Sequence, residues 1–143
     1  MKILQPAGWA APKGYANGTA ARGTLVFVGG QIGWNTRQQF ESDDFVAQAK
    51  AALANVVAVL ACAGARPEHI VRMTWYVTDK REYVASHAAL GRAYRETIGR
   101  HFPAMTAVEV KALIEDRAKV EIEATAVIPD TDRAMDGPPP AAR

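Results

Sequence analysis

The stretch Val120-Glu-Ile-Glu-Ala-Thr-Ala-Val-Ile128 alternates apolar and polar side chains, and this alternation predicts a strand. Successive side chains of a strand point to opposite faces of its sheet. Val120 and Ile122 therefore point to one face, while Glu121 and Glu123 lie side by side on the other. Because an apolar face must be buried against another layer of structure, we expect helices on the side of Val120 and Ile122.

Three further strands are predicted on the N-terminal side of this one. Leu25 to Gly30 is a short apolar run that ends on two glycines, and Ile70 to Val77 is β-branched and aromatic without a breaker. Met105 to Leu113 also has strand character and is followed by the polar turn Glu115-Asp-Arg-Ala118. Because this turn separates them, we expect Met105 to Leu113 and Val120 to Ile128 to pair as a hairpin.

Two segments have the periodicity of helices that pack by one face. Apolar residues recur three and four positions apart from Phe45 to Leu60, after the capping sequence Ser42-Asp-Asp44. The same spacing runs from Tyr83 to Ile98, between the capping pair Thr78-Asp79 and the stop at Gly99. The chain order is then strand, helix, strand, helix, strand, strand. This order predicts an α+β fold with two helices on one face of the sheet.

Composition indicates one globular domain. The chain has 143 residues, of which 49% are hydrophobic and 22% are charged, as in ordinary globular proteins. We expect a single domain over residues 1–129 and a disordered tail over residues 130–143, which contain Pro138-Pro-Pro140. The sheet face that no helix covers would be buried most simply in a symmetric homo-oligomer.

Charge, cysteine and histidine usage argue against several classes of partner. The net charge is +2 and the basic residues are dispersed among acidic ones, which argues against nucleic-acid binding. Cys62 is the only cysteine, and we expect it to be a small buried apolar side chain. The three histidines lack metal-ligand spacing, so no metal is expected. Without an export signal or an apolar stretch of membrane-spanning length, the sequence predicts a cytoplasmic protein with no membrane partner.

Several short motifs occur in a characteristic order and spacing. They are Leu25-Val-Phe-Val-Gly-Gly-Gln31, Ala52-Leu-Ala-Asn55, Phe102-Pro-Ala104 and Val120-Glu-Ile-Glu-Ala124. Through them the chain resembles the Rid family of reactive-intermediate deaminases, also called the YjgF family and often labelled L-PSP endoribonuclease. The resemblance implies a chorismate-mutase-like β-α-β-α-β-β fold with a mixed sheet. It also implies a homotrimer with a central barrel and a small-molecule cleft between each pair of subunits.

The same resemblance implies an activity and a set of site residues. Family deaminases hydrolyse reactive enamines or imines, such as 2-aminoacrylate, to a keto acid and ammonia without a cofactor. Glu121 matches the family glutamate that holds the attacking water, and Gly30 matches a glycine whose backbone lines the cleft. Tyr15 matches the family's N-terminal tyrosine, which is expected to bind substrate. Met105 and Thr106 follow the Pro-Ala pair, where deaminase members have an arginine.

The replacement of that arginine by Met105 predicts an altered substrate specificity. A guanidinium binds a carboxylate through two parallel hydrogen bonds, and a thioether supplies neither the charge nor the donors. Arg72, expected to share a strand face with Ile70 and Thr74, is a possible substitute cation, although a surface ion pair is the simpler interpretation. Arg100 and His101 also lie close to position 105 in the sequence, but they are more simply interpreted as charges at the end of the preceding helix. The alternative to a hydrolase is a noncatalytic ligand-binding or regulatory trimer, and neither the charge pattern nor the histidines support a ribonuclease.

Two further positions have both a functional and a structural interpretation. Glu121 is either a site carboxylate or an ordinary strand residue paired at a surface or an interface, whereas Glu123 is predicted to be structural. Gly91 replaces an asparagine common on the family's second helix. A glycine inside a helix costs about 1 kcal/mol relative to alanine, so Gly91 indicates close packing or the approach of a ligand.

Overall fold

The computed structural model describes residues 1–133. Its elements follow in the order β1 (Lys2–Leu4), β2 (Gly18–Ala20), β3 (Thr24–Ile32), α1 (Phe45–Cys62), the 3-10 turn η1 (Pro67–His69), β4 (Ile70–Val77), α2 (Lys80–Ala85), α3 (His87–Thr97), β5 (Ala104–Glu109), β6 (Val120–Ile128) and α4 (Asp130–Arg133). Within the tail predicted over residues 130–143, residues 130–133 form the short helix α4, and residues 134–143 lie outside the described part of the chain.

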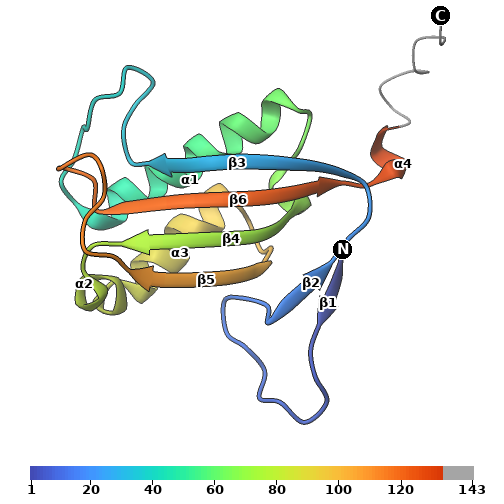
Figure 1. Ribbon diagram of the computed structural model, residues 1–143. Coiled ribbons are helices and arrows are strands. Elements are labelled where there is room, and N and C mark those ends of the chain that lie inside the picture. Colours follow the sequence, from blue (N-terminus) through green and yellow to red (C-terminus); the bar gives the residue numbers. More distant parts are fainter. Residues whose placement is uncertain (134–143) are drawn as a thin grey trace, which may run out of the picture.

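Four strands form one mixed sheet in the order β3-β6-β4-β5. Strand β6 runs antiparallel to both β3 and β4, whereas β5 runs parallel to β4. Helices α1 and α3 lie together behind one face of this sheet, and β1 and β2 form a separate ribbon that projects away from it (Figure 1). The predicted α+β fold, with helices on one face of a mixed sheet, is confirmed.

The predicted hairpin between the last two strands is wrong. Strand β4 lies between β5 and β6, so that Met73 pairs with Met105 on one side and with Ala124 on the other. The physical reason is that β5 follows a helical crossover from β4, and such a crossover returns the chain parallel to the strand it left. The segment after β5 then crosses the end of β4, where Val110 donates a backbone hydrogen bond to Val77 (2.8 Å).

One apolar layer joins α1 to the sheet. Asp44 caps α1 by accepting a hydrogen bond from the backbone of Ala47 at 2.8 Å. Buried α1 residues pack against the β6 residues that alternation assigned to the core; they are Phe45, Ala49, Ala52, Leu53, Val56 and Leu60 from α1, and Val120, Ile122, Ala124 and Ala126 from β6. The helix is long and apolar enough to cross a membrane by length and composition alone, contrary to our expectation for this sequence. Its buried residues instead form the core.

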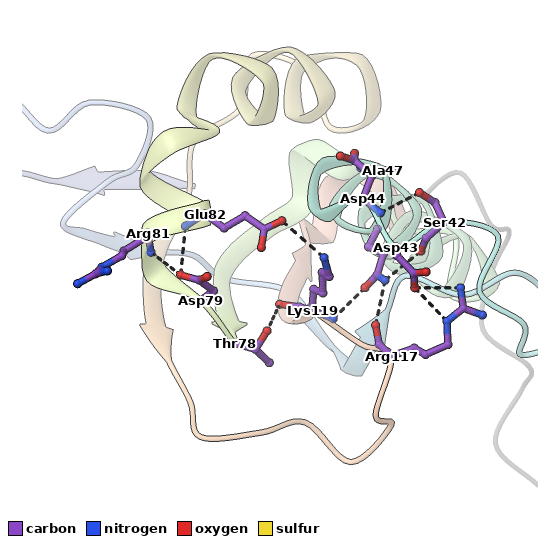
Figure 2. Close-up of polar contacts among 11 residues, drawn as sticks. Ser42, Asp43, Asp44, Ala47, Thr78, Asp79, Arg81, Glu82, Arg117 and Lys119 are labelled. Carbon is purple, nitrogen blue, oxygen red and sulfur yellow. Dashed lines mark hydrogen bonds and ion pairs between the residues drawn. The ribbon is translucent and has the colours of Figure 1, made fainter.

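The segment that crosses from β5 to β6 contacts the N-terminal ends of α1 and α2. Arg117 pairs with Asp43 beside the α1 cap at 3.0 Å, and Lys119 reaches Glu82 of α2 at 3.8 Å (Figure 2). The buried amide of Gln48 donates to the carbonyls of Ser42 and Arg117, both at 3.0 Å, and accepts from the backbone of Lys119 at 2.8 Å. These contacts fix where β6 begins, and therefore fix the position of Glu121.

Two other expectations need correction. The predicted second helix is divided at Ser86, whose φ of −98° and ψ of 8° depart from helical geometry, so α2 ends at Ala85 and α3 begins at His87. Cys62 is exposed rather than buried, because it lies at the last position of α1, beyond the stripe that ends at Leu60.

The face of the sheet opposite α1 has no cover within the described residues of one chain. Leu25 and Phe27 of β3 point to this side and are 59% and 73% exposed. Glu121, Glu123 and Thr125 of β6 lie on the same side and are only partly exposed. We call this surface the Glu121 face.

Candidate functional site

The carboxylate of Glu121 lies against the backbone of Gly30. Strand β3 bulges between Val28, which pairs with Ala124, and Gln31, which pairs with Ile122, so that Gly29 and Gly30 share one place in the register. A Cβ atom at Gly30 would lie 2.1 Å from Glu121 Oε1 and 2.8 Å from its Cδ. Only a residue without a side chain leaves room for the carboxylate in this position.

The two glutamates of β6 differ in their partners. Tyr76 Oη donates a hydrogen bond of 2.7 Å to Glu123 Oε1. This hydrogen bond to a carboxylate is the main cause that raises the pKa of Tyr76. Within residues 1–133 the Glu121 carboxylate has no hydrogen bond or ion pair. Glu123 is therefore engaged in holding two strands together, whereas Glu121 is available to a ligand.

A second bulge places Arg72 on the Glu121 face. The register of β4 shifts between Ile70 and Arg72, so Ile70 enters the core while Arg72 faces the other way with Thr74. The expectation that Arg72 shares a face with Ile70 is therefore wrong, and the expectation for Thr74 is confirmed. Arg72 lines a shallow hollow of about 310 Å³ with Thr74 and Glu123, and no ion pair engages it among the described residues.

Two other predicted binding residues, Tyr15 and Met105, line a different cavity, which we call the Met105 pocket. It has a volume of about 560 Å³ and lies between α3, β5 and the loop before β2. Its lining residues are Lys13, Gly14, Tyr15, Trp75, Tyr83, His87, Leu90, Gly91, Tyr94, Arg95, Phe102, Met105 and Ala107. Tyr15, Gly91 and Met105 thus line one cavity.

One chain divides the predicted site residues between opposite faces of the sheet. Met105 packs partly against the core on the helical side, whereas Glu121 and Gly30 meet on the uncovered side. Thr106 is exposed and pairs in register with Thr74, which in turn pairs with Glu123, so Thr106 belongs to the Glu121 face. Glu121 and Met105 are consequently not brought together within a single chain.

His101 and Arg100 lie near the Met105 pocket but do not line it. His101 Nε2 is 2.6 Å from the carbonyl oxygen of Ile70, and Tyr94 Oη donates to the carbonyl of His101 at 2.5 Å. Burial raises the pKa of Tyr94, as expected for a phenol that must stay neutral among apolar neighbours. Its ring stacks on Phe102 at a centroid distance of 5.6 Å. His101 therefore links the start of β4 to α3 beside the pocket, which is a structural role.

Sequence reasoning did not identify two cations of the pocket, Lys13 and Arg95. Arg95 lies four residues after Gly91 on α3, and residues at that spacing are neighbours on a helix surface. The signal was thus present in the sequence once Gly91 had been noted. For metals, no cluster of three or more His, Cys, Asp or Glu side chains that could hold an ion occurs within residues 1–133.

Comparison with known proteins agrees with this architecture. The family model described as Endoribonuclease L-PSP matches residues 7–128. A RutC family protein of Haemophilus influenzae is 39% identical over 105 residues, which cover 73% of this chain and 80% of that protein. A 2-iminobutanoate/2-iminopropanoate deaminase of Salmonella typhimurium is 35% identical over 105 residues, with the same coverage of 73% and 80%.

A solved structure shares the fold over nearly the whole chain. The Rid family protein YyfB of Yersinia pestis superposes with a TM-score of 0.78 at 29% sequence identity, covering 89% of this chain and 98% of that one. With a family model that spans most of the sequence and relatives above 30% identity, the chain belongs to the endoribonuclease L-PSP family, also known as the Rid or YjgF family.

Proposed function

We propose that this protein hydrolyses a reactive enamine or imine, with Glu121 holding and activating the attacking water. The observation that carries the proposal is the Glu121 carboxylate, which is seated against Gly30 and has no partner within residues 1–133. A neighbouring carboxylate on the same strand, Glu123, is bound by Tyr76 and serves the sheet. The name of the Salmonella relative, an iminobutanoate and iminopropanoate deaminase, supports the same chemistry.

The proposed reaction needs one general base and no cofactor. Glu121 accepts a proton from water while the water oxygen forms a bond to the iminium carbon. The resulting carbinolamine receives the proton on nitrogen. Glu121, again a carboxylate, takes the hydroxyl proton as the carbon–nitrogen bond breaks, so that ammonia leaves and the oxygen forms the carbonyl of a keto acid. Positioned acid–base groups typically contribute about 10²–10⁴-fold to such steps.

We propose that the site is completed between copies of the chain in a homotrimer. Glu121 and Gly30 lie on one face of the sheet, whereas Tyr15 and Met105 line a pocket on the other side. Two groups held apart in this way meet only if one copy supplies the first and a neighbour supplies the second. The exposed side chains of Leu25 and Phe27 provide apolar area that such an assembly would bury.

We extend the proposal to the substrate specificity, the functional domain and the cellular location of the protein. Met105 replaces the cation expected for 2-aminoacrylate, and Thr106, the next residue of β5, points to the opposite side, the Glu121 face. We expect poor hydrolysis of 2-aminoacrylate and better hydrolysis of an imine held by other contacts. Residues 1–129 would form the functional domain, and the protein would act in the cytoplasm on a small molecule, without nucleic-acid or membrane partners.

The test compares two isosteric variants on the same strand. Imines are generated in situ from a panel of amino acids by an L-amino-acid oxidase, and keto acid and ammonia are followed over the spontaneous rate. Glu121→Gln is expected to remove the acceleration. Glu123→Gln keeps an oxygen that accepts from Tyr76 and is expected to retain it. Equal rates in the wild type and Glu121→Gln would refute the hydrolase.

A noncatalytic ligand-binding or regulatory trimer is the second candidate, and Met105 is the observation that favours it. The pocket is retained, while the cation implied for the deaminase substrate is absent from position 105. This candidate predicts a small ligand that binds without turnover. Any keto acid formation that depends on Glu121 would count against it.

A further inference from the structure

The guanidinium of Arg95 lies over Gly91 at the Met105 pocket. A Cβ atom added at Gly91 would stand 3.2 Å from Arg95 Nη1. The absence of a side chain at position 91 therefore gives the arginine room to lie along α3, where both residues line the cavity. Gly91 and Arg95 act as a pair, since the first residue makes the space that the second occupies.

Among the described residues, Arg95 acts on the adjacent Glu96 only as a nearby charge, without a direct contact. Arg95 makes no ion pair or hydrogen bond through its side chain within residues 1–133. The adjacent acid, Glu96, is held by Lys50 of α1 at 2.6 Å, and this contact lowers the pKa of Glu96. Lys13 adds a second positive charge, and no aspartate or glutamate is among the described lining residues. A negatively charged ligand group would be attracted to this pocket.

A buried donor in the same pocket also lacks a partner. Trp75 is only 6% exposed, and its indole Nε1 has no hydrogen-bond partner in the described structure. Buried N–H groups without acceptors are rare in folded proteins. Trp75 lines the Met105 pocket, but its Nε1 is itself shielded from solvent, so the indole gives the cavity an apolar wall and a ligand oxygen could accept from Nε1 only after a rearrangement.

The remaining lining is large and apolar. Leu90, Tyr94, Phe102 and Met105 contribute to its walls, and the volume of about 560 Å³ lies within the range of small-molecule sites. Such walls suit an apolar side chain rather than a methyl group alone.

We propose that Arg95 replaces the missing arginine as the carboxylate anchor, and that the pocket takes 2-oxo or 2-imino acids with a bulky apolar side chain. The claim that the pocket binds these acids is argued from the pocket residues alone. The claim that the protein hydrolyses the 2-imino acids rests on the proposed function.

The binding test uses phenylpyruvate, the stable keto acid of this class, and isothermal titration calorimetry on the full chain. A hydrogen-bonded charge contact corresponds to roughly 10–100-fold in affinity, so Arg95→Gln is expected to weaken binding by that factor. Arg92→Gln is the matched control, because Arg92 is exposed on the same helix and does not line the pocket. Arg95→Lys, which keeps the charge, is expected to retain part of the affinity. Unchanged affinity in Arg95→Gln, or an equal loss in Arg92→Gln, would overturn the anchor.

The size preference is tested with pyruvate, which carries only a methyl group. Binding of pyruvate is expected to be at least roughly tenfold weaker than that of phenylpyruvate, because it buries less apolar area. Equal affinities would overturn the bulky-ligand claim.

Hydrolysis of the imine formed from L-phenylalanine then separates this inference from the proposed function. If Arg95→Gln loses affinity for phenylpyruvate while the wild type shows no turnover, the anchor is supported and the hydrolase is rejected. Turnover that is equal in the wild type and Arg95→Gln supports the hydrolase and rejects the anchor.

Discussion

Glu121 Oε1 occupies the space that a side chain on residue 30 would need. The ideal Cβ position at Gly30 is 2.1 Å from this oxygen, which is far inside van der Waals contact. Neither Gly30 nor its neighbour Gly29 has a positive φ, so the requirement for glycine at position 30 is one of space. The two adjacent glycines of the β3 bulge therefore provide a direct test of the carboxylate's position.

Gly30→Ala is expected to abolish Glu121-dependent hydrolysis with a small change in stability. The atoms displaced belong to the outer part of a flexible glutamate side chain, which can rotate away into solvent. Gly29→Ala is the control, since a Cβ there meets nothing within 4 Å. Keto acid formation and thermal unfolding of both variants check the prediction. Full activity in Gly30→Ala would show that the carboxylate need not lie against β3.

Phe27→Glu is expected to convert the proposed trimer into monomers. Phe27 is 73% exposed in one chain, and a charge placed in a buried apolar interface has no compensating partner. Val84→Glu is the matched control, because Val84 is 58% exposed but lies on α2, away from the Glu121 face. Sedimentation equilibrium measures the mass. A trimer that persists in Phe27→Glu would place the subunit contact elsewhere.

Local periodicity in the sequence was sufficient to predict which side chains of β6 face the core. The alternation is a property of one strand, and the structure confirms it from Val120 to Ala126, after which Val127 and Ile128 are both buried. Strand pairing depends on the whole topology, which is why the hairpin of β5 with β6 was wrong. The polar turn after β5 is compatible with either arrangement, and the crossover through α2 and α3 decides between them.

Errors about single side chains have an equally local cause. The bulge between Ile70 and Arg72 inserts one residue into the register, and this reverses the face of each side chain that follows. Uninterrupted alternation therefore gave the wrong face for Arg72. Arg95 was missed for another reason: its neighbours in the pocket come from β5 and the N-terminal loop, which only tertiary structure brings to α3.

Gln48→Leu is expected to lower the free energy of unfolding by about 3 kcal/mol. The substitution is close to isosteric, but it leaves three backbone groups at Ser42, Arg117 and Lys119 without their partner. Each buried group left unsatisfied costs about 1–3 kcal/mol, although partial rehydration of the loops reduces the sum. Urea denaturation measures the change. Gln39→Leu, at an exposed position, should change it by less than about 0.5 kcal/mol.

Tyr94 makes stability depend on alkaline pH. Burial raises the pKa of its phenol above the ordinary value of 10.0, so the folded state holds this proton more tightly than the unfolded state. The contribution is complete below pH 10 and is lost as the pH rises above that value. In Tyr94→Phe the hydrogen bond to His101 is absent, so the variant is less stable at neutral pH. Its unfolding free energy should fall less steeply above pH 10 than that of the wild type.

Gly91→Ala tests the pairing of Gly91 with Arg95 through two measurements. Inside α3 the substitution is expected to stabilise the fold by about 0.5–1 kcal/mol, because alanine loses less backbone entropy on folding. The contact it makes, 3.2 Å from Arg95 Nη1, involves the mobile end of an exposed side chain, which can move aside. Moving the guanidinium should weaken phenylpyruvate binding severalfold while the melting temperature rises. Ala88→Gly, at an exposed position of the same helix, should lower the melting temperature and leave the affinity unchanged. If Gly91→Ala raised stability without any loss of affinity, the space above residue 91 would have no part in holding the anion.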